Sequence, residues 1–390
     1  MAPKAAFDRF HRLLIPFISA IQLQIVMTAT LASAADIARL YHQQRQHQPV
    51  VARSVYRERV KKLERLHEAV LKHADLIHDA LYKDFRKGIT ETDISEIGVV
   101  TTEIRHVIRN LRTWMQPQQV STPIALMGSR SEVRRKPKGV SLIIAPWNYP
   151  VQLGLMPLIS AVAAGNCAII KPSEFTPYSS AALRAVVESC FTPEEVAVVE
   201  GDASVAQELM QYPFDHIFFT GSPTVGKIIM AGAAKHLSSV TLELGGKSPV
   251  IVDETANIDV AAAKIAWIKA MNAGQICIAP DYVLVQESVH DALVQKIGEK
   301  WEQFYGKTPE ARQKTADLCR IIHERHFERI VALIEDGMQK GAQLRFGGRH
   351  SKSDLYVEPT LLTDIGEDMQ IMHEEIFGPV LPVQKFKTLE

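Results

Sequence analysis

The stretch Gly139-Val-Ser-Leu-Ile-Ile-Ala-Pro-Trp-Asn-Tyr-Pro150 decides the fold class. Its first half, Val140–Ala145, is a short apolar run bounded by Gly and Pro, which is typical of a buried parallel strand. The same pattern recurs at Cys167–Ile170, Val196–Val199 and His216–Phe219. These four runs predict the strands of one buried sheet.

The segments between the runs are long enough for crossover helices, notably Pro150–Ala164, Ser179–Ser189 and Thr224–His236. Repeated strand–helix–strand units predict an α/β fold with a doubly wound parallel sheet. Ligands bind such a sheet beyond the carboxyl ends of its strands. The chemistry is therefore expected just after each strand, at Pro146–Asn148, Lys171–Glu174, Gly201 and Gly221–Gly226.

Two further regions flank this sheet. Upstream, apolar residues at three- and four-residue steps predict one long amphipathic helix over Ser54–Phe85 and a second helix over Asp93–Met115. Downstream of Gly245-Gly246, a second α/β section extends to the end of the chain. Its helices are expected near Val260–Met271, Val289–Tyr305 and Glu324–Gly337.

Composition narrows the function. The 390 residues carry 44 Lys and Arg against 44 Asp and Glu, a formal net charge of zero. A dedicated nucleic-acid binder usually carries a basic excess, so no nucleic-acid partner is expected. The four cysteines are scattered and form no C-x-x-C pair, which argues against a disulfide scaffold and a structural zinc site. We therefore expect a reduced compartment, the cytoplasm, where a special cysteine would act as a nucleophile.

Residues 1–36 differ from the rest. Basic residues precede a run without charged side chains from Leu13 to Ala35, and Ala32-Ser33-Ala34 loosely resembles a signal-peptide cleavage site. Two interpretations stay open. The segment is either an extension ahead of a start at Met27, or a targeting segment that would permit membrane association.

Two motifs resemble known ligand sites without matching them. Gly221-Ser-Pro-Thr-Val-Gly226-Lys-Ile228 nearly spells a P-loop, but Ile228 stands where a hydroxyl must ligate magnesium. A glycine-bounded turn at a helix start remains, able to bind phosphate through N–H groups, unless the glycines serve only close packing. In His323-Glu-Arg-His326, Phe327 replaces the second histidine of H-E-x-x-H, so we expect a solvated helix start and no metal site.

Three residues have the chemistry of an acyl-transfer site. Cys277 lies in Asn272-Ala-Gly-Gln-Ile-Cys-Ile-Ala-Pro280, a shaped turn, although a lone cysteine is more often a small buried hydrophobe. Glu243 stands among apolar residues, where burial would raise its pKa and suit a general base. A surface strand glutamate is the alternative. Asn148 follows a strand and is placed to donate to a developing oxyanion. A reactive Cys277 also requires surroundings that favour the thiolate.

Six motifs in order closely resemble the aldehyde dehydrogenase superfamily over roughly Ile37–Pro382. They are Pro146-Trp-Asn-Tyr-Pro150, Lys171-Pro-Ser-Glu174, Phe219-Thr-Gly-Ser222, Leu242-Glu-Leu-Gly-Gly-Lys247, Gly274-Gln-Ile-Cys277 and Glu374-Glu-Ile-Phe-Gly-Pro379. Three shorter segments are similar to its class 3 and fatty aldehyde branch: Trp147-Asn-Tyr149, Ala234-Lys-His-Leu237 and Ala279-Pro-Asp-Tyr282.

The resemblance implies roles for individual residues. Cys277 would be the nucleophile, Glu243 the base, and Asn148 with the Cys277 N–H the oxyanion hole. The residues implied in cofactor binding are Trp147, Lys171, Glu174, Gly221, Ser222, Gly226, Glu375 and Phe377. NAD is expected because Glu174 should repel a 2′-phosphate, with NADP as the alternative since class 3 relatives often tolerate both.

The resemblance also implies a division of the chain. A Rossmann-like NAD domain would comprise residues 37–119 and 138–245, a bridging or oligomerisation segment 120–137, and a catalytic domain 246–390. Relatives continue past Glu390, so the catalytic domain is expected to be incomplete, the chain to be C-terminally truncated, and the full-length form to be a homodimer.

The implied reaction is NAD(P)-dependent oxidation of a small-molecule aldehyde to an acid, through a thiohemiacetal and a thioester on the cysteine. Three alternatives remain. An enzyme that acylates coenzyme A is disfavoured by the presence of Glu243, and a cysteine hydrolase without a cofactor would need a histidine base, for which no histidine stands out as a partner of Cys277. The third is a truncated, non-catalytic binding or structural protein.

Overall fold

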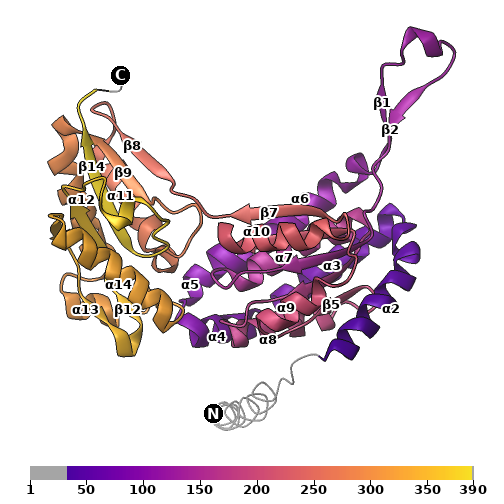
Figure 1. Cartoon of the computed structure of the whole chain (residues 1–390), viewed down its shortest axis with the longest axis horizontal. Helices are drawn as coiled ribbons and strands as arrows, with labels where there is room; N and C mark the ends of the chain where they lie inside the picture. The colour runs from indigo at the N-terminus through magenta and orange to yellow at the C-terminus, as the bar shows by residue number, and fades with distance from the viewer. Residues whose placement is uncertain (1–32, 389–390) are drawn as a thin grey trace, which may run out of the picture.

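Two five-stranded sheets organise the chain in the computed structural model, which describes residues 33–388 (Figure 1). The first sheet is parallel throughout and has the order β5-β4-β3-β6-β7. Its strands are β3 (Val140–Ile144), β4 (Cys167–Lys171), β5 (Val196–Val198), β6 (His216–Gly221) and β7 (Ser239–Leu244). The crossover helices are α7 (Pro150–Ala164), α8 (Pro177–Glu188), α9 (Ala203–Leu209) and α10 (Pro223–Ala234).

Both faces of the first sheet are covered, and alternate residues of one strand enter different cores. Ile143 of β3 and Ile170 of β4 pack with α7 and α8 and with helices α3, α4 and α6. Their neighbours Leu142 and Ile169 pack with α2, α9 and α10 on the opposite face. The sheet is therefore the middle layer of three, which confirms the predicted α/β, doubly wound class.

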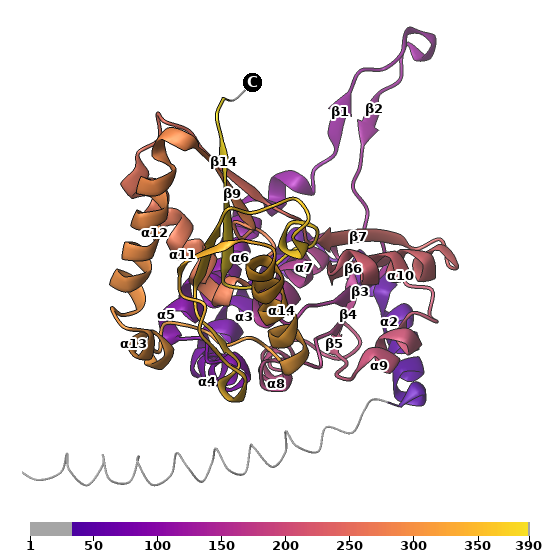
Figure 2. The same ribbon diagram turned by 60° about the vertical axis from the view of Figure 1, so that its left-hand side comes forward.

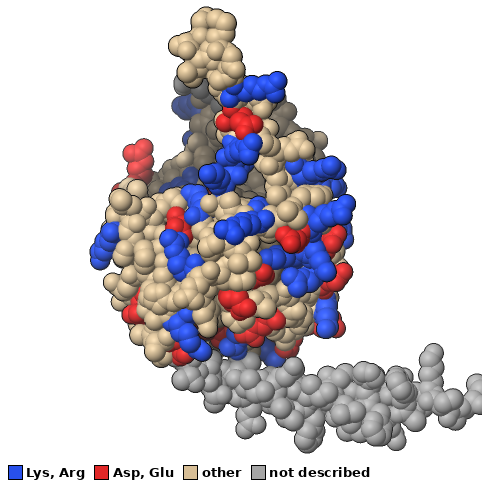
Figure 3. Space-filling model, turned by 90° about the vertical axis from the view of Figure 1, so that its right-hand side faces the viewer, with Lys and Arg blue, Asp and Glu red and all other residues tan. Residues whose placement is uncertain are grey.

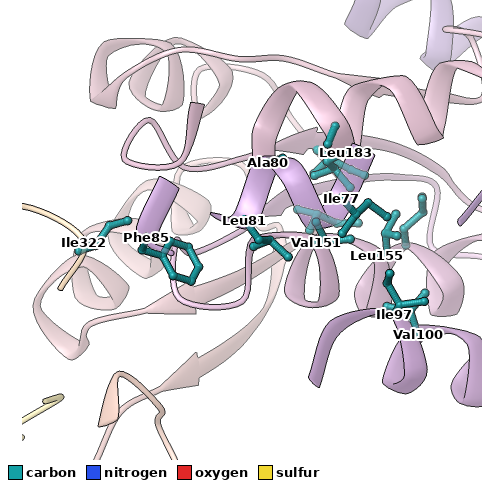
Figure 4. Close-up of a cluster of buried hydrophobic side chains, with 14 of the residues drawn as sticks. Ile77, Ala80, Leu81, Phe85, Ile97, Val100, Val151, Leu155, Leu183 and Ile322 are labelled. Atoms are coloured by element: carbon teal, nitrogen blue, oxygen red, sulfur yellow. The ribbon is translucent and has the colours of Figure 1, made fainter. Parts of the chain in front are cut away.

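The N-terminal helices are α2 (Ala34–Ala52), α3 (Tyr56–Lys72), α4 (Ala74–Phe85), α5 (Ile89–Thr92) and α6 (Gly98–Trp114), with a π-helical turn at Asp93–Ile97. The predicted single helix over Ser54–Phe85 is wrong, because the chain leaves helical geometry at His73 (φ −99°, ψ 15°). The apolar stripe continues through this break, so periodicity alone did not reveal it. Figure 4 shows the joint core that α4 forms with its neighbours, where the labelled side chains are Ile77, Ala80, Leu81, Phe85, Ile97, Val100, Val151, Leu155, Leu183 and Ile322.

The second sheet has the order β10-β13-β14-β9-β8, with only β10 antiparallel to its neighbour. Its strands are β8 (Pro249–Val252), β9 (Tyr282–Gln286), β10 (Gln343–Phe346), β13 (Thr360–Thr363) and β14 (Val380–Phe386), and a small hairpin joins β11 (His350–Ser351) to β12 (Tyr356–Val357). Its helices are α11 (Ile258–Ala270), α12 (His290–Tyr305), α13 (Pro309–Lys314) and α14 (Glu324–Gln339). Trp301 of α12 is fully buried in the core of this part, with its indole N–H on the Ala266 carbonyl at 2.8 Å.

A two-stranded arm projects from the first part of the molecule (Figures 1 and 2). Strands β1 (Gln118–Val120) and β2 (Ser131–Val133) pair in antiparallel register, and the tip contains a short 3₁₀ turn, Ile124–Leu126. Every residue of β1 is exposed, so the arm adds nothing to either core.

Two expectations concern the N-terminal segment and the membrane. Residues 1–32 of the signal-like segment lie outside the described residues. Its remaining residues are described: the side chain of Ser33 caps helix α2, which begins at Ala34. Within residues 33–388, no helix is both long enough and apolar enough to cross a bilayer.

Candidate active site

A cavity of about 580 Å³ lies at the carboxyl edge of the first sheet, between the two sheets. The strand order reverses at β3, which pairs with β4 on one side and β6 on the other. Such a switch point leaves a crevice at the carboxyl ends of the strands. The residues lining it include Trp147 and Asn148 after β3, Gly221 and Ser222 at the end of β6, Glu243 at the end of β7, and Cys277, Glu375 and Phe377 from the second part.

Three residues predicted for the site lie elsewhere. Lys171, the last residue of β4, and Glu174 do not line the cavity and form an ion pair of 2.7 Å with each other. Gly226 is buried inside helix α10, where an added Cβ would lie 2.8 Å from Leu244 of β7. The packing interpretation of that glycine therefore explains its position.

Cys277 alone is exposed among the four cysteines, all of which lie in the described part of the chain. It follows a 3₁₀ turn in which Asn272 (φ 49°), Ala273 (φ 51°) and Gly274 (φ 70°) are all left-handed. Side chains other than glycine adopt this conformation at a cost of about 1–2 kcal/mol per residue. Surrounding contacts must hold the turn, as is common at functional sites.

Hydrogen bonds from both sides hold this turn. The Asn272 amide donates to the carbonyls of Asn148 (2.9 Å) and Gln275 (3.2 Å), and its backbone N–H donates to the Glu91 carboxylate (2.7 Å). The Gln275 amide donates to the carbonyls of Asn272 (2.9 Å) and Arg320 (3.1 Å). The nucleophile loop is therefore bonded to the loop after β3 and to the segment before α14.

Asn148 is buried, and its amide donates to the Gln275 carbonyl at 3.1 Å. No second hydrogen bond from this nitrogen occurs within residues 33–388, so one N–H remains for a ligand. Behind it, Lys87 and Glu96 form a fully buried ion pair of 2.8 Å. Glu96 also accepts from the Gln152 N–H (2.7 Å) in the first turn of α7, which anchors the start of the helix that follows Asn148.

The electrostatics of Cys277 run against the expectation that its surroundings favour the thiolate. Partial burial, and then the carboxylates of Glu375 and Glu243, raise the pKa of the Cys277 thiol. The surroundings of Cys277 therefore favour the neutral thiol, first because the sulfur is partly buried and second because the carboxylates of Glu375 and Glu243 repel a thiolate.

Glu243 also differs from its prediction. Its side chain is exposed at the cavity wall, so the expected burial is wrong and the surface alternative describes its position. The last residues of β7 pair only with β6 on one side and face the cavity on the other, which leaves this carboxylate in contact with solvent.

Glu375 is the more enclosed carboxylate. Its Oε1 is buried and has no hydrogen-bond partner within residues 33–388, and burial raises its pKa. The carboxylate lies so close to Gly245 that any added Cβ there would overlap it. A buried acceptor without a partner, open to a cavity, is suited to a ligand hydroxyl.

Two basic side chains, Lys247 and Arg329, hold the segment that carries Glu375. Lys247 forms an ion pair with Asp281 and donates to the Ile371 and Glu374 carbonyls at 2.9 and 3.0 Å. Arg329 of α14 pairs with the Glu374 carboxylate at 3.0 Å and donates to the Glu375 carbonyl at 3.1 Å.

Sequence reasoning missed the part of the cavity wall that α14 provides. His326 is not solvated as expected: its Nε2 donates to the Phe377 carbonyl at 2.8 Å, and its ring lies 5.4 Å from Trp147. Burial and the nearby Arg329 lower the pKa of His326 to about 3, so the ring stays neutral. The spacing of His326 and Arg329, three residues apart on one helix face, was the available signal. Within residues 33–388, no group of side chains has the arrangement of a metal site.

Comparisons with known proteins identify the family. The sequence profile of the aldehyde dehydrogenase family matches residues 11–390. The chain is 42% identical to 4,4′-diaponeurosporen-aldehyde dehydrogenase of Staphylococcus aureus, covering 85% of this chain and 71% of that protein. It is 41% identical to human aldehyde dehydrogenase family 3 member B1, covering 85% and 69%.

Solved structures give the same result. The substrate-bound state of Staphylococcus aureus AldH superposes with a TM-score of 0.86 at 40% identity, over 90% of this chain and 76% of that one. The relatives include family 3 members, which confirms the class 3 resemblance. The chain belongs to the aldehyde dehydrogenase family, whose reaction is the oxidation of an aldehyde.

Proposed function

We propose that the protein oxidises an apolar aldehyde to its carboxylic acid with NAD, through a thioester on Cys277. The observation that carries the proposal is the cavity, which brings an exposed cysteine, a carboxylate and a buried amide to one switch point. No histidine base is required, because Glu243 lines the same cavity.

In the first step, the Cys277 thiolate adds to the aldehyde carbon and forms a thiohemiacetal. The Asn148 amide N–H and the Cys277 backbone N–H donate to the new oxyanion. Removal of one such donor typically reduces the rate by about 10²–10³-fold. The hydrogen bond from Asn148 to the Gln275 carbonyl orients the amide and the nucleophile loop relative to each other.

The residues fit a dinucleotide. The N-terminus of α10, capped by Ser222, opens toward the cavity and suits a pyrophosphate. The unpartnered Glu375 Oε1 suits a ribose hydroxyl beside the nicotinamide, with Trp147 and Phe377 packing next to it. Bound NAD supplies the acceptor for the hydride.

At the adenosine end, Lys171 and Glu174 would bind the ribose hydroxyls. Glu174 disfavours a 2′-phosphate, which makes NAD the proposed cofactor and NADP the alternative. Gly226 permits the close approach of α10 to Leu244 of β7, and an added Cβ at Gly221 would meet the ring of Phe219 in β6.

In the second step, Glu243 removes a proton from water, which attacks the thioester and releases the acid. Its exposed position at the cavity wall gives it direct access to solvent water. The free cysteine is then ready for another aldehyde.

The substrate class follows from the apolar side chains around the nucleophile loop. Tyr149 forms a small buried cluster with Ile276 and Ala279, which flank Cys277 in sequence, and Leu153 and Met271 pack against this cluster. Because these side chains offer no charge to a polar aldehyde, we propose a long hydrocarbon substrate. The family 3 relatives, and the Staphylococcus aureus relative named for 4,4′-diaponeurosporen-aldehyde, support that class.

We further propose the division into an NAD-binding part (37–119 and 138–245), a bridging arm (120–137) and a catalytic part (246–390). The arm tip exposes Ile124 (87%) and Met127 (85%), which suits contact with a second copy in a homodimer. Light scattering would measure the molar mass in solution and so test the homodimer. Free thiols at all four cysteines suit the cytoplasm.

The test is NADH formation at 340 nm with a long-chain aldehyde and NAD, in the presence and absence of coenzyme A. The proposal predicts free acid as the product and no activity in Cys277→Ala. Formation of an acyl-CoA, or full activity in Cys277→Ala, would contradict it.

A further inference from the structure

Positive charge is concentrated in one segment of a chain whose net charge is zero. Residues 105–138 carry eight Lys and Arg against one acidic residue, Glu132, a net charge of +7. All eight basic residues are exposed. The segment comprises the outer face of α6 and the whole projecting arm.

The first group of these charges forms a stripe on α6. Arg105, Arg109 and Arg112 recur at four- and three-residue steps, so they share one face of the helix. The opposite face, which includes Ile104 and Val107, is buried in the main core. The charged stripe is therefore fixed on the surface by a rigid helix.

The second group lies at the base of the arm, where Arg134, Arg135 and Lys136 follow β2 directly. The Arg135 guanidinium donates to the Trp114 carbonyl at 3.4 Å, which joins the base of the arm to the last turn of α6. The two groups are therefore continuous. Figure 3 shows Lys and Arg side chains gathered on the face that carries the arm.

Most of these charges have no acidic partner. Arg134 pairs with Glu132, but Arg105, Arg109 and Arg112 form no ion pair with any residue in the described range 33–388. The indole of Trp114 is 39% exposed at the end of the stripe. Like charges held together without acids repel one another, so an anionic partner would be attracted to this surface.

We propose that the basic surface of α6 and the arm base binds anionic phospholipid membranes. The apolar face of α6 is occupied by the protein core, so the attraction would come from the exposed Arg and Lys side chains, each of which is favoured beside an anionic leaflet. The exposed Trp114 at the end of the stripe is a side chain that membrane–water interfaces favour. A single-stranded nucleic acid would instead require a groove with several aromatic platforms, and this face offers one exposed Trp. The proposal is independent of the dehydrogenase reaction. If the protein is also a long-chain aldehyde dehydrogenase, membrane binding would bring it to the bilayer in which its substrates dissolve.

The test is co-sedimentation of the full chain with vesicles of phosphatidylserine and phosphatidylcholine, and with phosphatidylcholine alone. We expect binding to the anionic vesicles only, and its loss near 1 M salt, where the Debye length falls to about 3 Å. The triple variant Arg105→Glu, Arg109→Glu, Arg112→Glu should bind at least about 100-fold more weakly, because each basic residue near an anionic surface contributes about fivefold and each introduced Glu is repelled.

The matched control reverses three other exposed charges without ion pairs, in Lys264→Glu, Lys307→Glu, Lys314→Glu on the second part of the molecule. It should bind vesicles like the parent, with circular dichroism verifying the fold of both variants. Equal loss of binding in the control, equal binding to neutral vesicles, or tighter binding to single-stranded RNA than to anionic vesicles at matched phosphate concentration would overturn the proposal.

Discussion

The left-handed turn before Cys277 provides a stringent test of how the nucleophile is held. Gly274 has φ +70°, and a Cβ built there would overlap the Gly378 carbonyl and lie 2.9 Å from the Lys269 carbonyl. In Gly274→Ala, the positive φ alone costs about 1–2 kcal/mol. The overlap with backbone atoms adds about 1–3 kcal/mol. The free energy of unfolding should therefore fall by about 2–5 kcal/mol.

Gly341→Ala is the matched control for this change. Gly341 also has a positive φ (+104°), but nothing lies within 4 Å of the added Cβ. The free energy of unfolding of Gly341→Ala should fall only by the cost of the positive φ, about 1–2 kcal/mol, and its activity should be unchanged.

Activity separates the two variants further. Relief of the overlap at Gly274 moves the loop that carries Cys277, and a displacement of about 1 Å can reduce the rate about 10²-fold. Urea unfolding and NADH formation at 340 nm measure the two effects. If Gly274→Ala matched Gly341→Ala in both stability and kcat/KM, the reasoning about the turn would be refuted.

The strands of the first sheet could be predicted from sequence because each is buried on both faces. Continuous apolar runs such as Val140–Ala145 are the direct result of that burial. Helix α2 and the break at His73 could not be predicted. Helix α2 has Pro49 inside it and only a weak apolar stripe, since it packs through scattered residues such as Tyr41 and Gln44.

The positions of the site residues could be predicted, because ligands bind at the carboxyl ends of parallel strands and the motifs at the ends of β3, β6 and β7 share that edge of the sheet. The burial and the electrostatics of these residues could not be predicted. The exposure of Glu243 follows from the place of β7 at the edge of the sheet, and the raised pKa of Cys277 follows from its partial burial and from Glu375, which is distant in sequence. A local pattern carries no information about such neighbours.

Three further predictions follow from the charges and contacts of the site. Cys277→Ser should abolish turnover but keep NAD binding, and NADH production by a correctly folded variant would exclude Cys277 as the nucleophile. The Glu375 carboxylate raises the pKa of the Cys277 thiol, so Glu375→Gln should lower that pKa. Iodoacetamide should then label Cys277 faster in the cofactor-free protein near pH 8, and an unchanged labelling rate would disprove the coupling. His326 titrates near 3 when folded and near 6.5 when unfolded, so its contribution to stability is complete above about pH 6.5 and is lost toward pH 3. His326→Gln should flatten the pH dependence of the unfolding free energy in that window by up to about 1.4 kcal/mol per pH unit, and a slope equal to the parent's would show that His326 is not responsible.

The central claim is that an acyl group is carried on Cys277 and released by water that Glu243 activates. The most direct measurement is rapid mixing of Glu243→Gln with NAD and a long-chain aldehyde, followed by acid quench and peptide mass spectrometry. Glu254→Gln, an exposed glutamate outside the cavity, is the control and should turn over like the parent. We predict a burst of about one NADH per active site, then stalling, with the acyl mass on the peptide that contains Cys277. Steady turnover by Glu243→Gln at the parental rate, or a burst with the acyl group on another residue, would contradict the account.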